Sequence, residues 1–254
     1  MKFNLEKEQQ RVRFVLEKRK LPPMRAAVGF ALDVSGSTRD LYRQGIIQRA
    51  VEQIMPVGLQ FDDNGSLDGW TFSEGEDMIA ELAQATRENY QNFVQREILG
   101  SGVPKWSGTD YAPVIKLMLK KYGFYGNGAP AKRGGFLKRL LGGDSATGQS
   151  GNLRAQSGSG EAVINYFVTD GQNDDQDETY HLLRECQSAK VNMYFLFMGV
   201  GDPSRFGFLT KIAEDFGNVG FLSIAELEKF VDSDDIYEKL LPEELTGWLR
   251  QKQG

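Results

Sequence analysis

The chain has 254 residues, 40% hydrophobic and 26% charged, a balance typical of a globular protein with one sizeable core. Thirty Lys and Arg against thirty-five Asp and Glu give a net charge of −5, so we do not expect a nucleic-acid-binding protein. A single cysteine, Cys186, and a single histidine, His181, exclude a disulfide framework and Cys/His zinc sites. Any bound metal must therefore be held by oxygen atoms.

The sequence shows neither an export signal nor a membrane span. Residues 1–8 carry charges where a secretory signal would have an apolar run, and the most apolar stretch, residues 193–200, is too short to cross a bilayer. We therefore expect a cytoplasmic protein, with peripheral attachment to the inner face of the membrane as the alternative.

Continuous apolar runs, typical of strands buried on both faces, alternate with segments of helical apolar spacing. In chain order the predicted elements are a charged helix in the first twenty residues, a strand at 26–32, a helix at 46–55, strands at 67–72 and 78–82, helices at 90–99 and 112–122, a strand at 162–169, a helix at 174–189, a strand at 191–200, a helix at 205–216, a strand at 219–222 and an acidic helical tail at 225–251. This alternation predicts a three-layer α/β fold with a doubly wound, mostly parallel sheet.

We divide the chain into three parts. A charged N-terminal helix and linker occupies residues 1–24, the main α/β domain residues 25–231, and an acidic C-terminal helix residues 232–254. Residues 126–160 interrupt the main domain with ten of the twenty-nine glycines, and five Lys and Arg against the single acid Asp144 give them a net charge of +4. We expect a flexible basic insertion there, because loop-closure entropy grows slowly with loop length.

The basic insertion contains a stretch, residues 132–141, with apolar residues at helical spacing and basic residues between them. A short basic amphipathic turn can contact an anionic membrane or an acidic partner. The contact residues would be Lys132, Arg133, Phe136, Lys138 and Arg139. The alternative is a solvated loop, which we favour because the flanking glycines oppose helix formation.

Two of the predicted buried strands end in an aspartate. Asp33 begins the segment Asp-Val-Ser-Gly-Ser, in which an extended backbone would direct Asp33, Ser35 and Ser37 to one side. Asp170 ends the second strand. Because ligands of an open α/β sheet bind beyond the carboxyl ends of its strands, we expect both carboxylates in one crevice.

The loop at residues 106–111 adds Thr109, whose hydroxyl could join this group. Carboxylate and hydroxyl oxygens are hard ligands suited to Mg²⁺ or Mn²⁺. Each motif taken alone is also ordinary at helix starts and strand-to-turn steps. The combination of all three, two of them at strand ends, favours a metal site over these structural alternatives.

These residues resemble the metal-ion-dependent adhesion site of von Willebrand factor A domains. The resemblance covers about residues 25–231 and implies a mostly parallel sheet with one antiparallel edge strand. It also implies Mg²⁺, or alternatively Mn²⁺ or Ca²⁺, with five protein ligands, the last of them direct or through water: Asp33, Ser35, Ser37, Thr109 and Asp170.

A narrower similarity comes from Lys20–Pro23, Phe61–Asp68, Thr71–Ser73 and Phe167–Asp174. These segments look like the TerF-like group, the intracellular bacterial A domains associated with tellurium resistance and stress operons. The resemblance implies a non-enzymatic adhesion or scaffold domain in such a system. Its partner, for example another tellurium-resistance protein, would supply an Asp or Glu to the metal, and no small-molecule substrate is expected.

Two alternatives to this function stay open. The first is a Mg²⁺-dependent phosphoryl-transfer enzyme that uses Asp33 and Asp170. Against it, Ser35 occupies the position where comparable enzymes have a second carboxylate as general acid, and no phosphate-binding glycine-rich loop is present. The second is a membrane-surface scaffold that acts through the basic insertion.

Overall fold

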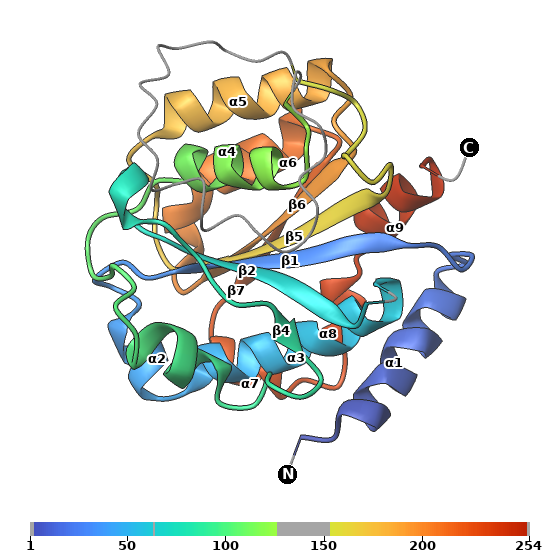
Figure 1. Ribbon diagram of the computed structural model, residues 1–254, viewed down its shortest axis with the longest axis horizontal. Helices are drawn as coiled ribbons and strands as arrows, with labels where there is room; N and C mark the ends of the chain where they lie inside the picture. Colours follow the sequence, from blue (N-terminus) through green and yellow to red (C-terminus); the bar gives the residue numbers. More distant parts are fainter. Residues whose placement is uncertain (1–2, 63, 126–152, 253–254) are drawn as a thin grey trace.

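The computed structural model describes residues 3–62, 64–125 and 153–252, and places helices on both faces of one twisted sheet (Figure 1). The strands are β1 (Ala26–Asp33), β2 (Ser66–Phe72), β3 (Ala80–Glu81), β4 (Ala85–Thr86), β5 (Ala162–Thr169), β6 (Met193–Val200) and β7 (Val219–Ile224). Their spatial order is β3-β2-β1-β5-β6-β7, with β4 also paired to β2. The pairs among β1, β2, β5, β6 and β7 are parallel, whereas β3 and β4 run antiparallel to β2.

The helices form two layers. They are α1 (Leu5–Lys18), α2 (Arg39–Arg43), α3 (Ile46–Phe61), α4 (Ala112–Lys121), α5 (Gln176–Ser188), α6 (Gly207–Asp215), α7 (Leu227–Val231), α8 (Ile236–Leu240) and α9 (Glu243–Arg250), with the short 3₁₀-helices η1 (Glu76–Met78) and η4 (Pro203–Phe206) and the π-helix η2 (Gln95–Leu99). Helices α4, α5 and α6 cover one face of the sheet, and α1, α3, α7 and α8 lie on the other (Figure 1).

The buried strands supply a separate hydrophobic core on each face. In β1, Val28, Phe30 and Leu32 face the core below α1 and α3, whereas Ala27 and Ala31 face the core below α4 and α5. Successive side chains of a strand point to opposite faces, so a continuous apolar run is what a sheet covered on both sides requires. The predicted three-layer, mostly parallel fold with an antiparallel edge is therefore confirmed.

Several predicted elements differ in detail. The strand expected at 78–82 is reduced to β3, and β4 adds a second short antiparallel pairing on β2. The helix expected at 90–99 is only the π-helix η2, and α2 was not predicted.

The acidic segment expected to be one helix at 225–251 consists of the three short helices α7, α8 and α9. Pro242, which cannot donate a backbone hydrogen bond, separates the last two. Their apolar residues Leu240, Leu245 and Leu249 are fully buried in the same core as α1. The acidic side chains thus occupy the outer face of a packed layer, and the boundaries at 24/25 and 231/232 stay predictions.

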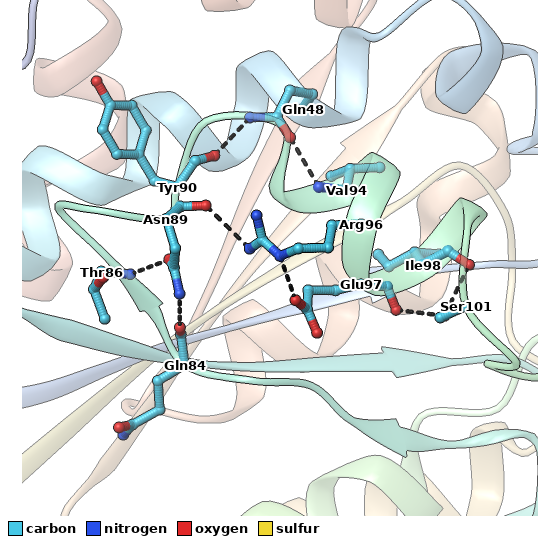
Figure 2. Close-up of polar contacts among 10 residues, drawn as sticks. All are labelled: Gln48, Gln84, Thr86, Asn89, Tyr90, Val94, Arg96, Glu97, Ile98 and Ser101. Carbon is cyan, nitrogen blue, oxygen red and sulfur yellow. Dashed lines mark hydrogen bonds and ion pairs between the residues drawn. The ribbon is translucent and has the colours of Figure 1, made fainter.

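The segment between β4 and η2 is fastened to α3 by side-chain amides (Figure 2). The Gln48 amide donates to the Tyr90 carbonyl at 2.8 Å and accepts from the Val94 backbone N–H at 2.8 Å. Asn89 accepts from the Thr86 N–H at 2.7 Å and donates to a neighbouring backbone carbonyl. These bonds satisfy buried backbone groups in a stretch with little regular structure.

Lys105 caps the C-terminal end of the π-helix η2. The Lys105 ammonium donates to the carbonyls of Ile98, Ser101 and Val103 at 3.2, 3.3 and 2.9 Å. These carbonyls have no helical partner, and a cation is favourable at this end of a helix. The next residue begins the loop that carries Thr109, so this cap fixes where that loop starts.

The residues predicted to touch a membrane or an acidic partner, at positions 132–139, lie outside the described residues. Of the predicted flexible insertion, residues 153–160 are described and bond to the core: Arg154 N–H donates to the Phe124 carbonyl at 2.7 Å and Gly158 N–H to the Tyr122 carbonyl at 2.7 Å. Within the described ranges, no helix has the length and apolar character needed to cross a bilayer.

Candidate metal centre

The predicted site lies where the strand order reverses. β1 pairs with β2 on one side and with β5 on the other, so the chain leaves β1 in one direction and returns to its opposite edge. Asp33 is the last residue of β1, and Asp170 follows the last residue of β5. The two aspartates therefore stand at the carboxyl ends of neighbouring parallel strands, where α/β sheets bind ligands.

Four of the five predicted ligands form a continuous chain of hydrogen bonds. Asp33 Oδ1 accepts from the Ser35 N–H at 2.7 Å, which turns the backbone directly after the strand. The hydroxyls of Ser35 and Ser37 lie 3.1 Å apart, and Ser37 Oγ donates to Asp170 Oδ1 at 2.7 Å. Oxygen atoms from two distant parts of the sequence thus converge as predicted.

Thr109, the fifth predicted ligand, reaches the site on a loop held by backbone bonds. Gly36 N–H donates to the Ser107 carbonyl at 3.0 Å, and Trp106 N–H donates to the Val34 carbonyl at 2.6 Å. On the other side, Asp174 N–H donates to the Thr109 carbonyl at 2.8 Å. The loop is therefore bonded both to the segment after β1 and to the segment after β5, and Thr109 is buried.

Trp106 adopts a left-handed backbone conformation, with φ of +78°. This conformation is strained for an aromatic residue, and such strain persists where the surroundings enforce it. Here the bond to Val34 and an edge-on contact with the Tyr42 ring, at 5.6 Å between centroids, hold the residue. With this backbone conformation at Trp106, the chain turns back toward the site.

The carboxylates of Asp33 and Asp170 are incompletely neutralised by neighbouring positive charges. Asp33 is 1% exposed, and burial raises its pKa from 3.8 to about 6, against the opposing hydrogen bonds from Ser35 and Thr169. Burial also raises the pKa of Asp170, which is opposed by the Ser37 hydroxyl and the nearby Arg205. Over the described residues, no ion pair includes either aspartate. A bound cation would offset this cost.

The donor set fits a hard divalent cation. It combines two carboxylates with three hydroxyls, the oxygen ligands that Mg²⁺ accepts. No group of three or more His, Cys, Asp or Glu in the described part of the chain lies close enough to hold a metal. The site therefore depends on its hydroxyl groups as much as on its aspartates.

Sequence reasoning missed a buried layer beneath the site. The Thr169 hydroxyl donates to Asp33 Oδ2 at 2.7 Å, and the Tyr111 hydroxyl lies 3.1 Å from the Thr169 hydroxyl and donates to the Gly171 carbonyl at 3.0 Å. Asp175 accepts from the N–H groups of Tyr111 and Ala112 at the start of α4. These contacts orient the predicted ligands. The supporting residues could not be identified from the sequence, because a hydroxyl side chain at the end of a strand is common.

A family model of von Willebrand factor A domains, described as the type found in the TerF C terminus, matches residues 25–131 and 151–254. The protein YcbR of Bacillus subtilis (strain 168) is 30% identical over 249 residues, 96% of this chain and 86% of YcbR.

Solved structures are more distant. Proximal thread matrix protein 1 from the mussel byssus has a TM-score of 0.48 at 17% identity, over 85% of this chain and 47% of the mussel protein, so the chain spans about half of that protein's length. The manganese-loaded TRAP protein of Plasmodium vivax has a TM-score of 0.43 at 10% identity, over 87% of this chain and 73% of TRAP. With the family match over most of its length, the chain belongs to the TerF-like family of von Willebrand factor A domains.

Proposed function

We propose that this chain is a non-enzymatic domain that binds a partner protein in a Mg²⁺-dependent manner. The cation would be held by Asp33, Ser35, Ser37, Thr109 and Asp170, with Mn²⁺ or Ca²⁺ as substitutes. The observation that carries the proposal is the hydrogen-bonded chain that runs from Asp33 through the Ser35 backbone N–H and the Ser35 and Ser37 hydroxyls to Asp170, built around a buried carboxylate that forms no ion pair among the described residues.

When bound, the cation supplies a coordination position that a carboxylate from outside can occupy. Ser37 is the exposed member of the set, so its edge of the site faces a partner. Asp33 stays behind it, held by Ser35 and Thr169. The partner group would be an Asp or Glu side chain, which is the hard anionic ligand that a protein surface offers.

The burial of Asp33 argues against the phosphoryl-transfer alternative. A nucleophilic carboxylate must reach the substrate, yet Asp33 is 1% exposed and both of its oxygens accept hydrogen bonds. Ser35 cannot act as the missing general acid, since a serine hydroxyl is far less acidic than a carboxyl group, and its oxygen lies 3.1 Å from the Ser37 hydroxyl. We therefore propose binding rather than catalysis.

Membership of the TerF-like family supports a role in a bacterial tellurium-resistance or stress-response system. We propose that the domain acts in the cytoplasm and that its partner is another protein of such a system. Contact with the inner face of the membrane through residues 132–139 stays a separate proposal, tested by liposome flotation with and without the insertion.

Two experiments test the function. Calorimetric titration with Mg²⁺ should show one site in the wild type and none in Asp33→Ala, while Asp40→Ala, which removes an exposed aspartate from α2, should bind as the wild type does. Capture of partners from the native cell should then succeed in Mg²⁺ and fail in EDTA or with Asp33→Ala. A partner retained equally in EDTA would refute the metal-dependent mode of binding.

A further inference from the structure

Two exposed arginines border the proposed metal site. Arg39 is the first residue of α2, two positions after Ser37, and its guanidinium lies 5.1 Å from the centre of the Trp106 ring. The contact with Trp106 holds the guanidinium at the loop that carries Thr109, since Trp106 is itself bonded to Val34. Stacking on an aromatic ring leaves the edge of a guanidinium free to donate hydrogen bonds.

Arg205 approaches the site from η4, the helix after β6. Its Nη2 atom lies 3.5 Å from the position that a Cβ on Gly171 would occupy, so the guanidinium extends over the turn that follows Asp170. Its charge acts on Asp170, whose pKa it lowers against the effect of burial.

Neither arginine is held in an ion pair among the described residues, although the charge of Arg205 acts on the carboxylates of Asp170 and Asp202. Over the described residues, no hydrogen bond or ion pair involves the side chain of Arg39 or Arg205, whereas the neighbouring Arg43 is paired with Asp40 at 3.5 Å. In a chain with five more acidic than basic residues, two unmatched arginines beside one site are available for a ligand. Guanidinium groups bind carboxylates in a bidentate manner, which favours an acidic ligand.

Acidic side chains border a different part of the site. A Cβ on Gly108 would lie 3.1 Å from both Glu74 Oε2 and Asp174 Oδ2, so the two carboxylates lie close to the residue before Thr109. Both are exposed, and neither forms an ion pair among the described residues. Acidic groups of a partner are therefore favoured beside the arginines and disfavoured beside Gly108.

We infer that Arg39 and Arg205, named here the arginine pair, select a partner segment with further acidic side chains close to the carboxylate that reaches the cation. The inference rests on the proposed function, because it describes how the partner of that same site is chosen. The partner class is an acidic peptide segment in which further acidic residues stand close to the central acid, and peptides of this kind are called grouped peptides below.

The test uses an array of synthetic thirteen-residue peptides in a Gly/Ser background. Each peptide carries one central Asp, with two further Glu residues before it, after it, on both sides or absent. The full chain is applied in Mg²⁺ and in EDTA as the wild type, as Arg39→Ala/Arg205→Ala, and as the control Arg13→Ala/Arg184→Ala, which removes two exposed arginines from α1 and α5.

In Mg²⁺ the wild type should prefer at least one of the grouped peptides to the single-Asp peptide by about two- to thirty-fold, since an exposed ion pair contributes about 0.2–1 kcal/mol and two such pairs are formed. The double variant of the arginine pair should lose this preference and keep its Mg²⁺-dependent binding of the single-Asp peptide. The control variant should behave as the wild type does.

The two proposals fail in different ways. If the preference for grouped acids is absent, or survives Arg39→Ala/Arg205→Ala, the arginine pair does not select the partner, while Mg²⁺-dependent binding of the single-Asp peptide would leave the proposed function intact. If no peptide binds more strongly in Mg²⁺ than in EDTA, the proposed function fails, and the selection inferred from it fails with it.

Discussion

The burial of Asp33 predicts an unusual effect of Asp33→Asn on the metal-free protein. Folding raises the pKa of Asp33 from 3.8 to about 6, mainly through burial. The folded protein therefore holds a proton at Asp33 between these pH values that the unfolded chain releases. The stability from this group is complete below pH 3.8 and is lost as the pH rises through about 6.

The magnitude follows from the size of the pKa rise. Each pKa unit corresponds to about 1.4 kcal/mol, so ionised Asp33 costs the metal-free protein about 3 kcal/mol at pH 8 compared with pH 3.5. An amide at this position keeps one acceptor for the Ser35 N–H and cannot ionise. The variant should therefore lack this part of the pH dependence, whatever it loses in hydrogen bonding to Thr169.

Urea unfolding in EDTA, measured for both proteins from pH 4 to pH 8, tests this reasoning. The free energy of unfolding of Asp33→Asn, relative to the wild type, should rise by about 2.4 kcal/mol across the range, because contributions of other groups cancel in the difference and part of the effect is already lost at pH 4. At pH 7.5, Mg²⁺ at a hundred times its Kd should stabilise the wild type by about 2.7 kcal/mol and leave the variant unchanged. If the difference in the free energy of unfolding between Asp33→Asn and the wild type stays constant with pH in EDTA, burial does not destabilise the ionised Asp33 carboxylate, and the reasoning is refuted.

Three further predictions concern the site and the sheet beneath it. Thr109→Ala should weaken Mg²⁺ binding about tenfold or more in calorimetry, with little change in the melting temperature in EDTA; unchanged affinity would remove Thr109 from the ligand set. Arg205→Ala should strengthen Mg²⁺ binding several-fold at low ionic strength and less in high salt, because it removes a nearby positive charge; weaker binding would contradict this. Gly29→Ala should destabilise the fold by about 1–3 kcal/mol in urea unfolding, since its Cβ would lie 2.5 Å from the Asn165 amide oxygen. The control Gly217→Ala should be neutral, because its Cβ would meet nothing within 4 Å. Equal effects of the two substitutions would refute the packing argument.

The residues of the site that could be predicted are those whose positions depend on the sequence immediately around them. An apolar run that ends in Asp33 predicts both a buried strand and the edge at which it ends, and Asp170 repeats the pattern. Because parallel neighbours end at one edge of a sheet, this local information also brings the two carboxylates together. The prediction for Ser35 and Ser37 assumed an extended segment after the strand, whereas the backbone bends and turns there, beginning with the Ser35 N–H bond to Asp33.

What the sequence did not predict depends on contacts between distant segments. Arg205 matters because the turn after β6 brings it beside Gly171, and no local pattern distinguishes it from other surface arginines. Thr169 is oriented by Tyr111, which lies 58 residues away in the chain. The division of the acidic helical tail into three helices was not predicted, because it depends on contacts of leucines such as Leu245 with the core.

The central claim is that five oxygen-bearing side chains from three segments hold one divalent cation. A crystal structure of the full chain grown with Mn²⁺ tests it most directly, because the anomalous signal of the metal locates the ion independently of the protein atoms. The account predicts one strong peak within bonding distance of the oxygens of Asp33, Ser35 and Ser37, with Thr109 and Asp170 completing the protein ligands directly or through water. A Mn²⁺-containing crystal without a peak at this position would contradict it.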